Sequence, residues 1–131
     1  MEEETSDSSS EASPLVQVRK LAEVLSAFAE ERDWNQYHSP KNLVMALSGE
    51  VGELSEIFQW MTEDASKGAS KDPACAQAIQ DELADVLIYL VRLSDVLNVD
   101  LNAAVLQKLK TNASKYPVSK ARGTSKKYTD I

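Results

Sequence analysis

The sequence predicts an all-α protein with an antiparallel, four-helix-bundle-like fold. Four segments repeat apolar residues at spacings of three and four, the period of an amphipathic helix. Ser-Pro or Asp-Pro pairs, which are typical helix starts, stand before three of these segments. No stretch reads as a convincing strand. With 131 residues, of which 43% are hydrophobic and 27% charged, the chain suits one domain with tails.

The first helix is expected from Ser13-Pro14 to near Arg32 and the second over residues 40–63. Ser39-Pro40 gives the second helix its start signal. The apolar stripe of the first is Val18, Leu21, Leu25 and Phe28. The stripe of the second is Leu43, Leu47, Val51, Leu54, Phe58 and Met61. Both stripes predict a single buried face.

The third helix is expected to start at Asp72-Pro73, after an exposed polar connection that contains Gly68. Its stripe has the heptad-like register of antiparallel bundles: Ile79, Leu83, Val86, Leu90, Leu93 and Leu97. Asp100 can cap a fourth helix, and Pro117 ends any helical extension. Apolar faces left over on these helices predict self-association.

Charge is distributed unevenly along a chain whose net charge is -7. Residues 1–13 hold five acids and no base, so we expect a disordered acidic arm there, followed by a helical domain over 14–116 and a basic tail over 117–131. The net negative charge argues against a nucleic acid polymer as partner. No apolar run approaches the about 20 residues of a membrane span. With one cysteine, Cys75, and no targeting signal, we expect a cytosolic protein, with the nucleus as an alternative location.

Two pairs of acids stand at i, i+3 on the second and third predicted helices: Glu50 with Glu53, and Glu82 with Asp85. Residues three apart share one helix face, and both pairs adjoin the apolar stripes. If the helices pack antiparallel, four like charges meet at the core edge, which is costly unless a cation neutralises them or their pKa values rise. Oxygen ligands without His or Cys suit a hard ion, Mg2+ or Mn2+.

The alternative is that these acids are solvated, as i, i+3 acid pairs on helix surfaces usually are. Two pairs on neighbouring amphipathic helices weaken that interpretation. Gly49 and Gly52 each cost about 1 kcal/mol of helix stability relative to alanine, which suggests close approach by another backbone or a ligand. A di-iron centre is a weaker alternative because it needs Glu-x-x-His on two helices. The single histidine, His38, lies in a predicted loop.

The spacing Glu50-x-x-Glu53, 28 residues, then Glu82-x-x-Asp85 resembles the metal signature of the MazG-like all-alpha nucleoside triphosphate pyrophosphatases. Within that superfamily, six segments in order are similar to the members that hydrolyse dCTP. They span roughly residues 15 to 130. The segments are Glu30–Trp34, Leu47–Leu54, Phe58–Trp60, Asp85–Val91, Lys115–Val118 and Lys127–Asp130.

The resemblance implies a homotetramer that uses Mg2+ to cleave a deoxynucleoside triphosphate, dCTP or a modified dCTP, to the monophosphate and diphosphate. Such an enzyme cleans the nucleotide pool. The metal ligands and catalytic carboxylates it implies are Glu50, Glu53, Glu82 and Asp85. Glu56, one turn beyond Glu53, would be an accessory ligand or an exposed acid. Mg2+ would neutralise both the acids and the triphosphate.

The resemblance also implies a base site and phosphate contacts. The base site would comprise Trp34, Asn35, Gln36, Tyr37 and His38 with Trp60 and Tyr89, whose rings can stack on a pyrimidine or merely pack in the core. Trp60 and Tyr89 should share helix faces with the acids. The phosphate contacts would be Asn112, Lys115 and Tyr116. Mammalian members carry a histidine in the first helix where this chain has Leu25, which leaves the base preference open.

Two other functions stay open from the sequence. One keeps the chemistry but prefers dUTP or another triphosphate. The other is a helical interaction module without enzyme activity, in which the acids are solvated and the basic tail binds a partner.

Overall fold

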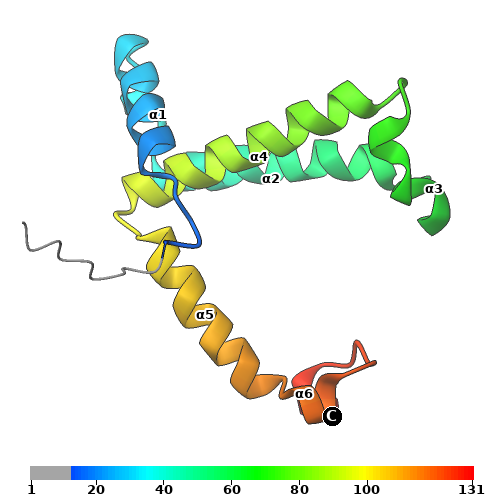
Figure 1. The fold of residues 1–131 in the computed structure, drawn as a ribbon. Coiled ribbons are helices and arrows are strands. Elements are labelled where there is room, and N and C mark those ends of the chain that lie inside the picture. Colours follow the sequence, from blue (N-terminus) through cyan, green and yellow to red (C-terminus); the bar gives the residue numbers. More distant parts are fainter. Residues whose placement is uncertain (1–12) are drawn as a thin grey trace, which may run out of the picture. The chain divides into compact units, whose positions relative to one another are not determined.

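The structure, a computed structural model, describes residues 13–131 (Figure 1). Helices and loops make up this described part, which holds no strand, so the all-α prediction is confirmed. The chain forms two compact units, residues 18–101 and residues 102–131 together with the segment before residue 18. Apart from Ser13, the predicted acidic arm lies outside the described residues.

Helix α1 (Arg19–Glu31) begins later than the Ser13-Pro14 signal predicts, so that start is wrong. The preceding segment is bonded elsewhere: the Val16 N–H donates to Asn102 Oδ1 at 3.1 Å. After α1 the chain reverses through Asp33, whose φ of 54° is left-handed. The short 3-10 helix η1 (Asn35–Tyr37) follows and leads into the second long helix.

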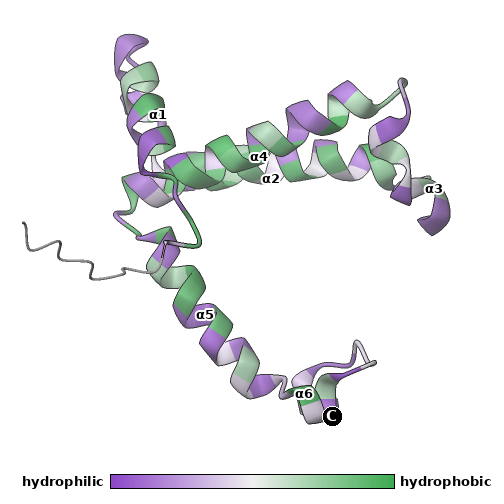
Figure 2. Cartoon of the chain, in the orientation of Figure 1, coloured by the Kyte–Doolittle hydropathy of each residue, from purple (hydrophilic) through white to green (hydrophobic). Residues whose placement is uncertain are grey.

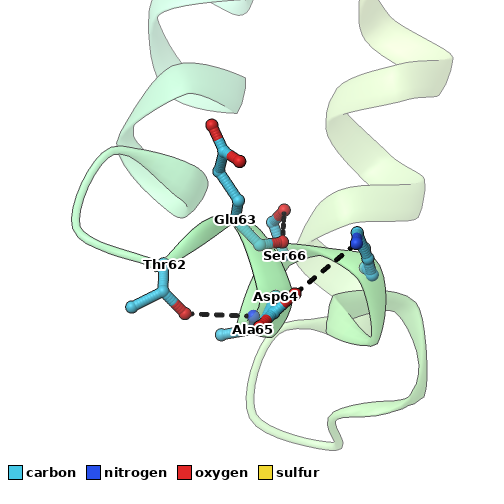
Figure 3. A network of polar contacts seen from close by, with 6 residues as sticks. Thr62, Glu63, Asp64, Ala65 and Ser66 are labelled. Atoms are coloured by element: carbon cyan, nitrogen blue, oxygen red, sulfur yellow. Dashed lines mark hydrogen bonds and ion pairs between the residues drawn. The ribbon is translucent and has the colours of Figure 1, made fainter.

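Helix α2 (Pro40–Phe58) starts where predicted, because Ser39 Oγ accepts from the Asn42 N–H at 3.2 Å and Pro40 takes the first helical position. It ends before residue 63. Thr62 opens a separate helix, α3 (Glu63–Lys67), by accepting the Ala65 N–H on Oγ1 at 3.1 Å (Figure 3). The predicted loop therefore contains α3 and the 3-10 helix η2 (Ala69–Lys71).

Helix α4 (Ala76–Val96) starts after the Asp72-Pro73 signal, not at it. Asp72 Oδ1 accepts from the Ala74 N–H at 2.9 Å, which is an Asx turn and delays the helix. Helices α2 and α4 lie antiparallel and side by side, as predicted, and α1 packs against α4 (Figure 1). Hydrophobic and hydrophilic residues alternate along both α2 and α4 (Figure 2). The core of this unit includes Leu43 and Val91, which are 1% and 0% exposed.

The other unit contains α5 (Leu101–Lys115), α6 (Val118–Ala121) and the 3-10 helix η3 (Tyr128–Asp130). Tyr128 packs edge-on against Tyr116, with ring centroids 5.9 Å apart, and Lys115 Nζ lies 4.8 Å from the Tyr128 ring. These contacts join the predicted basic tail to the end of α5. Among the described helices, none has the length and apolar character needed to span a membrane.

Candidate metal centre

The α2–α4 hairpin brings three acids together. Glu50, Glu53 and Glu82 each place a carboxylate oxygen so that all three oxygens lie within 4.8 Å of one another. Glu50 and Glu53 are one turn apart on α2, and Glu82 faces them from α4. The antiparallel packing of the two apolar stripes therefore produces the cluster.

Part of this cluster is buried without a partner. Glu50 Oε2 and Glu82 Oε2 are shielded from water, and neither has a hydrogen-bond partner among the residues the structure describes. None of the ion pairs formed by those residues includes a cluster acid. Buried charge without a counter-ion is destabilising, so a bound cation would stabilise the cluster.

Without a cation, the pKa values of two cluster acids, Glu50 and Glu82, are raised. The side-chain hydrogen bond with Glu50, burial and the neighbouring Glu53, in decreasing order of effect, together raise the pKa of Glu82 to about 7. The hydrogen bond with Glu82 lowers the pKa of Glu50, but burial, the interactions with Glu53 and the charge of Asp85 outweigh it, and the net shift is upward. Like charges and desolvation thus favour protonation.

These features fit a divalent metal ion. The donor set is oxygen only, one oxygen from each of three acids is close enough to share an ion, and Glu50 and Glu82 each have a buried oxygen without a partner among the described residues. Asp85 is half-buried and close enough to influence the pKa of Glu50, but its oxygens fall outside the 4.8 Å group. Glu56 is exposed and also outside it.

The glycines beside the first acid pair are not required by packing within the described chain. A Cβ atom built on Gly49 or Gly52 would meet no atom within 4 Å. The predicted close approach is therefore not made by the backbone of residues 13–131.

The loop between α1 and α2 holds five of the predicted base-site residues. Trp34 packs edge-on against Phe28, with centroids 5.7 Å apart, and its ring lies tilted to His38 at 6.3 Å. The Asn42 side chain donates to the Tyr37 carbonyl at 2.9 Å, and Gln36 Nε2 donates to Asp33 Oδ2 at 3.0 Å. Trp34 and Tyr37 remain 43% and 60% exposed, so the loop presents aromatic surface.

Arg92, which is not among the predicted site residues, joins α4 to this loop. The residue is buried, its Nε donates to His38 Nδ1 at 3.1 Å, and its Nη2 donates to Asn35 Oδ1 at 2.8 Å. Its Nη1 lies 3.6 Å from Asp95 Oδ2. A signal was present in the sequence: Arg92 interrupts the apolar run Val86–Leu93.

The other predicted base-site residues lie on different parts of the hairpin. Tyr89 is half-buried on α4, one turn from Asp85, as expected. The helical register predicted for Trp60 is wrong, because α2 ends at Phe58 and Trp60 lies in the following turn, 88% exposed. Leu25 is half-buried on α1.

The predicted phosphate contacts belong to the unit of α5. Asn112 accepts the Tyr116 N–H on its carbonyl at 2.8 Å, which continues the helical bonding past Lys115. Lys115 and Tyr116 both contact the Tyr128 ring.

A comparison with protein families matches residues 45–131 to the MazG-like family. The matched part includes all four acids of the two pairs. The chain belongs to the MazG-like family. It is 46% identical to dCTP pyrophosphatase 1 of Rattus norvegicus over 91% of this chain and 70% of the relative, and equally so to that of Homo sapiens. With the Bos taurus protein of that name, identity is 51% over 79% of this chain and 62% of the relative.

The fold of a pyrophosphatase of known structure is similar to that of this chain and supports its place in the MazG-like family. The crystal structure of a pyrophosphatase from Archaeoglobus fulgidus superposes with a TM-score of 0.70 at 40% identity. The match covers 75% of this chain and 90% of the other. Family membership therefore agrees with the predicted resemblance in both sequence and fold.

Proposed function

We propose that this MazG-like protein is a Mg2+-dependent dCTP diphosphatase, which converts dCTP and modified dCTP to dCMP and diphosphate and so cleans the nucleotide pool. The reaction comes from the relatives at 46–51% identity, which are dCTP pyrophosphatases. The metal dependence rests on the acid cluster. The single observation that carries it is the pair of buried carboxylate oxygens without partners, Glu50 Oε2 and Glu82 Oε2.

In this proposal the chain's residues divide the work. The metal ion would be held by Glu50, Glu53 and Glu82, with Asp85 beside them. When bound, it would neutralise the charge of the triphosphate and make a bound water more acidic. Because the pKa of Glu82 is raised to about 7, ligation requires Glu82 to lose its proton. Glu56 is the candidate accessory ligand.

Substrate recognition is assigned to the remaining predicted residues. The exposed rings of Trp34, Tyr37 and Trp60 are available to stack on a base, and Tyr89 lies one turn from Asp85. Asn35, Gln36 and His38 offer polar groups for its edge. The phosphate contacts proposed in the α5 unit are Asn112, Lys115 and Tyr116, which combine donors with one positive charge.

We also propose a homotetramer. Large apolar side chains are exposed on the α2–α4 hairpin, among them Met45 at 65%, Val51 at 45% and Leu83 at 54%. Exposed apolar surface of this kind is typical of subunit interfaces. Light scattering should give four times the 14.4 kDa chain mass, and a stable monomer would refute the tetramer.

The reaction is tested by incubating the purified protein with dCTP, with and without Mg2+, and separating the products by ion exchange. We expect dCMP and diphosphate only when Mg2+ is present. Formation of dCDP and phosphate would refute the proposed cleavage. Faster turnover of dUTP or another triphosphate would keep the chemistry and change the substrate. No turnover of any triphosphate would favour the helical interaction module.

A further inference from the structure

Arg92 is a buried cation on α4 that donates hydrogen bonds to the loop between α1 and α2. It is 7% exposed, and each of its three side-chain nitrogens has a different partner: His38, Asn35 and Asp95. Burying a guanidinium group is costly unless its donors are satisfied. Two of the three compensating contacts come from the loop that precedes α2, so loop and arginine depend on each other.

The bond from Arg92 fixes which nitrogen of His38 carries a proton. The Nε–H of arginine is a permanent donor, so His38 Nδ1 must accept at 3.1 Å. A neutral imidazole that accepts on Nδ1 carries its proton on Nε2. Burial lowers the pKa of His38 from its ordinary value of 6.5, and the charge of Arg92 lowers it further, which agrees with a neutral ring.

The same bonds hold the shape of the loop. Asn35 is the first residue of η1, and His38 follows its last residue. Arg92 therefore donates a hydrogen bond at each end of this 3-10 helix. The His38 ring in turn lies against Trp34, at 6.3 Å between centroids. The orientation of the proposed base-site residues therefore depends on a side chain from α4.

We propose that Arg92 is a positioning residue for base recognition, which sets the shape of the Trp34–His38 loop and keeps His38 as a donor through Nε2. This inference rests on the proposed function. A fixed donor suits an acceptor on the base, such as N3 of cytosine, whereas N3 of uracil carries a proton. Arg92 thus favours dCTP over dUTP without touching either nucleotide.

The kinetic test compares dCTP and dUTP on Arg92→Met and Arg92→Lys. Methionine fills similar volume without polar atoms, and lysine keeps the charge but offers one donor nitrogen in place of the planar fork that reaches His38 and Asn35 from separate nitrogens. We expect both variants to raise KM for dCTP about tenfold or more, with kcat changed much less, and to reduce the preference for dCTP over dUTP. Arg19→Gln, which removes an exposed charge from α1, is the matched control and should behave as wild type.

A second measurement needs neither nucleotide nor metal. The chain has one histidine, so nitrogen-15 NMR of the imidazole reports His38 alone. We expect Nδ1 to be unprotonated in the wild type and the His38 pKa to move up toward 6.5 in Arg92→Met. Circular dichroism of each variant checks that helicity is retained.

The outcomes separate the two proposals. Wild-type protein without activity on any triphosphate would overturn the proposed function and the Arg92 role with it. An active wild type whose dCTP preference and KM persist in both Arg92 variants would overturn only the Arg92 role. Wild-type behaviour of Arg92→Lys would also overturn it, because a positive charge without the geometry of the guanidinium group would then be sufficient.

Discussion

Helix α4 carries two charged clusters that differ in whether their charges are satisfied. At Arg92 a buried cation has a partner for every nitrogen. At Glu82 a carboxylate meets other carboxylates, and two buried oxygens have no partner among the described residues. The satisfied cluster is complete within the chain and fixes structure. The unsatisfied one requires something that the chain does not supply, which is the property of a binding site.

The largest effect should come from removing charge at the unsatisfied cluster. Glu53→Gln or Asp85→Asn should lower turnover by about a hundredfold or more, because each removes a negative ligand charge while preserving side-chain shape. Helicity should be nearly unchanged. Steady-state assays and circular dichroism check this. Glu63→Gln, on α3 beyond the hairpin, is the matched control, and full activity in both cluster variants would refute the site.

The contrast between the clusters also explains what the sequence could predict. The acid pairs were visible because i, i+3 spacing places side chains on one face, and the antiparallel stripes brought Glu50 and Glu82 together. Arg92 was not visible as part of a site, because its partners His38 and Asn35 are distant in sequence and come from an irregular loop. Residue spacing predicts contacts within and between regular helices, but it does not predict which helix residues an irregular loop will contact.

A helix boundary could be predicted from the sequence only where no other local hydrogen bond competed with the capping residue. Ser39 caps α2 as expected. At Asp72 the same kind of signal was diverted by an Asx turn, and Ser13-Pro14 precedes a non-helical segment whose Val16 N–H bonds to Asn102. The end of α2 was overestimated because Thr62 caps a new helix. That error also gave Trp60 a helical register that it does not have.

A smaller effect should distinguish the clusters by pH. Glu82 has a folded pKa of about 7 against an ordinary value of 4.5. Because the folded value is raised, its stabilising contribution is complete below the ordinary value and is lost as pH rises through about 7. Metal-free Glu82→Gln should therefore melt several degrees above the wild type at alkaline pH and close to it in acid. The titration of His38 is common to both proteins and cancels in the difference.

Thermal melts in a chelator across this pH range make the comparison. Glu63→Gln again serves as control and should follow the wild type at every pH. A wild type that gains stability relative to Glu82→Gln as pH rises would contradict repulsion within the cluster.

The smallest effect is expected at a cap that belongs to neither cluster. Thr62→Ala removes the side-chain bond to the Ala65 N–H, at a cost of about 1 kcal/mol in unfolding free energy. Because α3 is short and exposed, turnover and dCTP preference should be unchanged. Chemical denaturation and the same assays test this, and a large loss of activity would mean that the hairpin end contributes to the site.

Calorimetric titration of Mg2+ and Mn2+ into metal-free protein tests directly whether the acid cluster binds a metal ion. We expect binding by the wild type and by Arg92→Met, with proton release that diminishes above about pH 7 because Glu82 has then already lost its proton. Glu53→Gln should bind both ions much more weakly. Equal binding by wild type and Glu53→Gln, or none by either, would contradict the claim that the unsatisfied acids form the metal site.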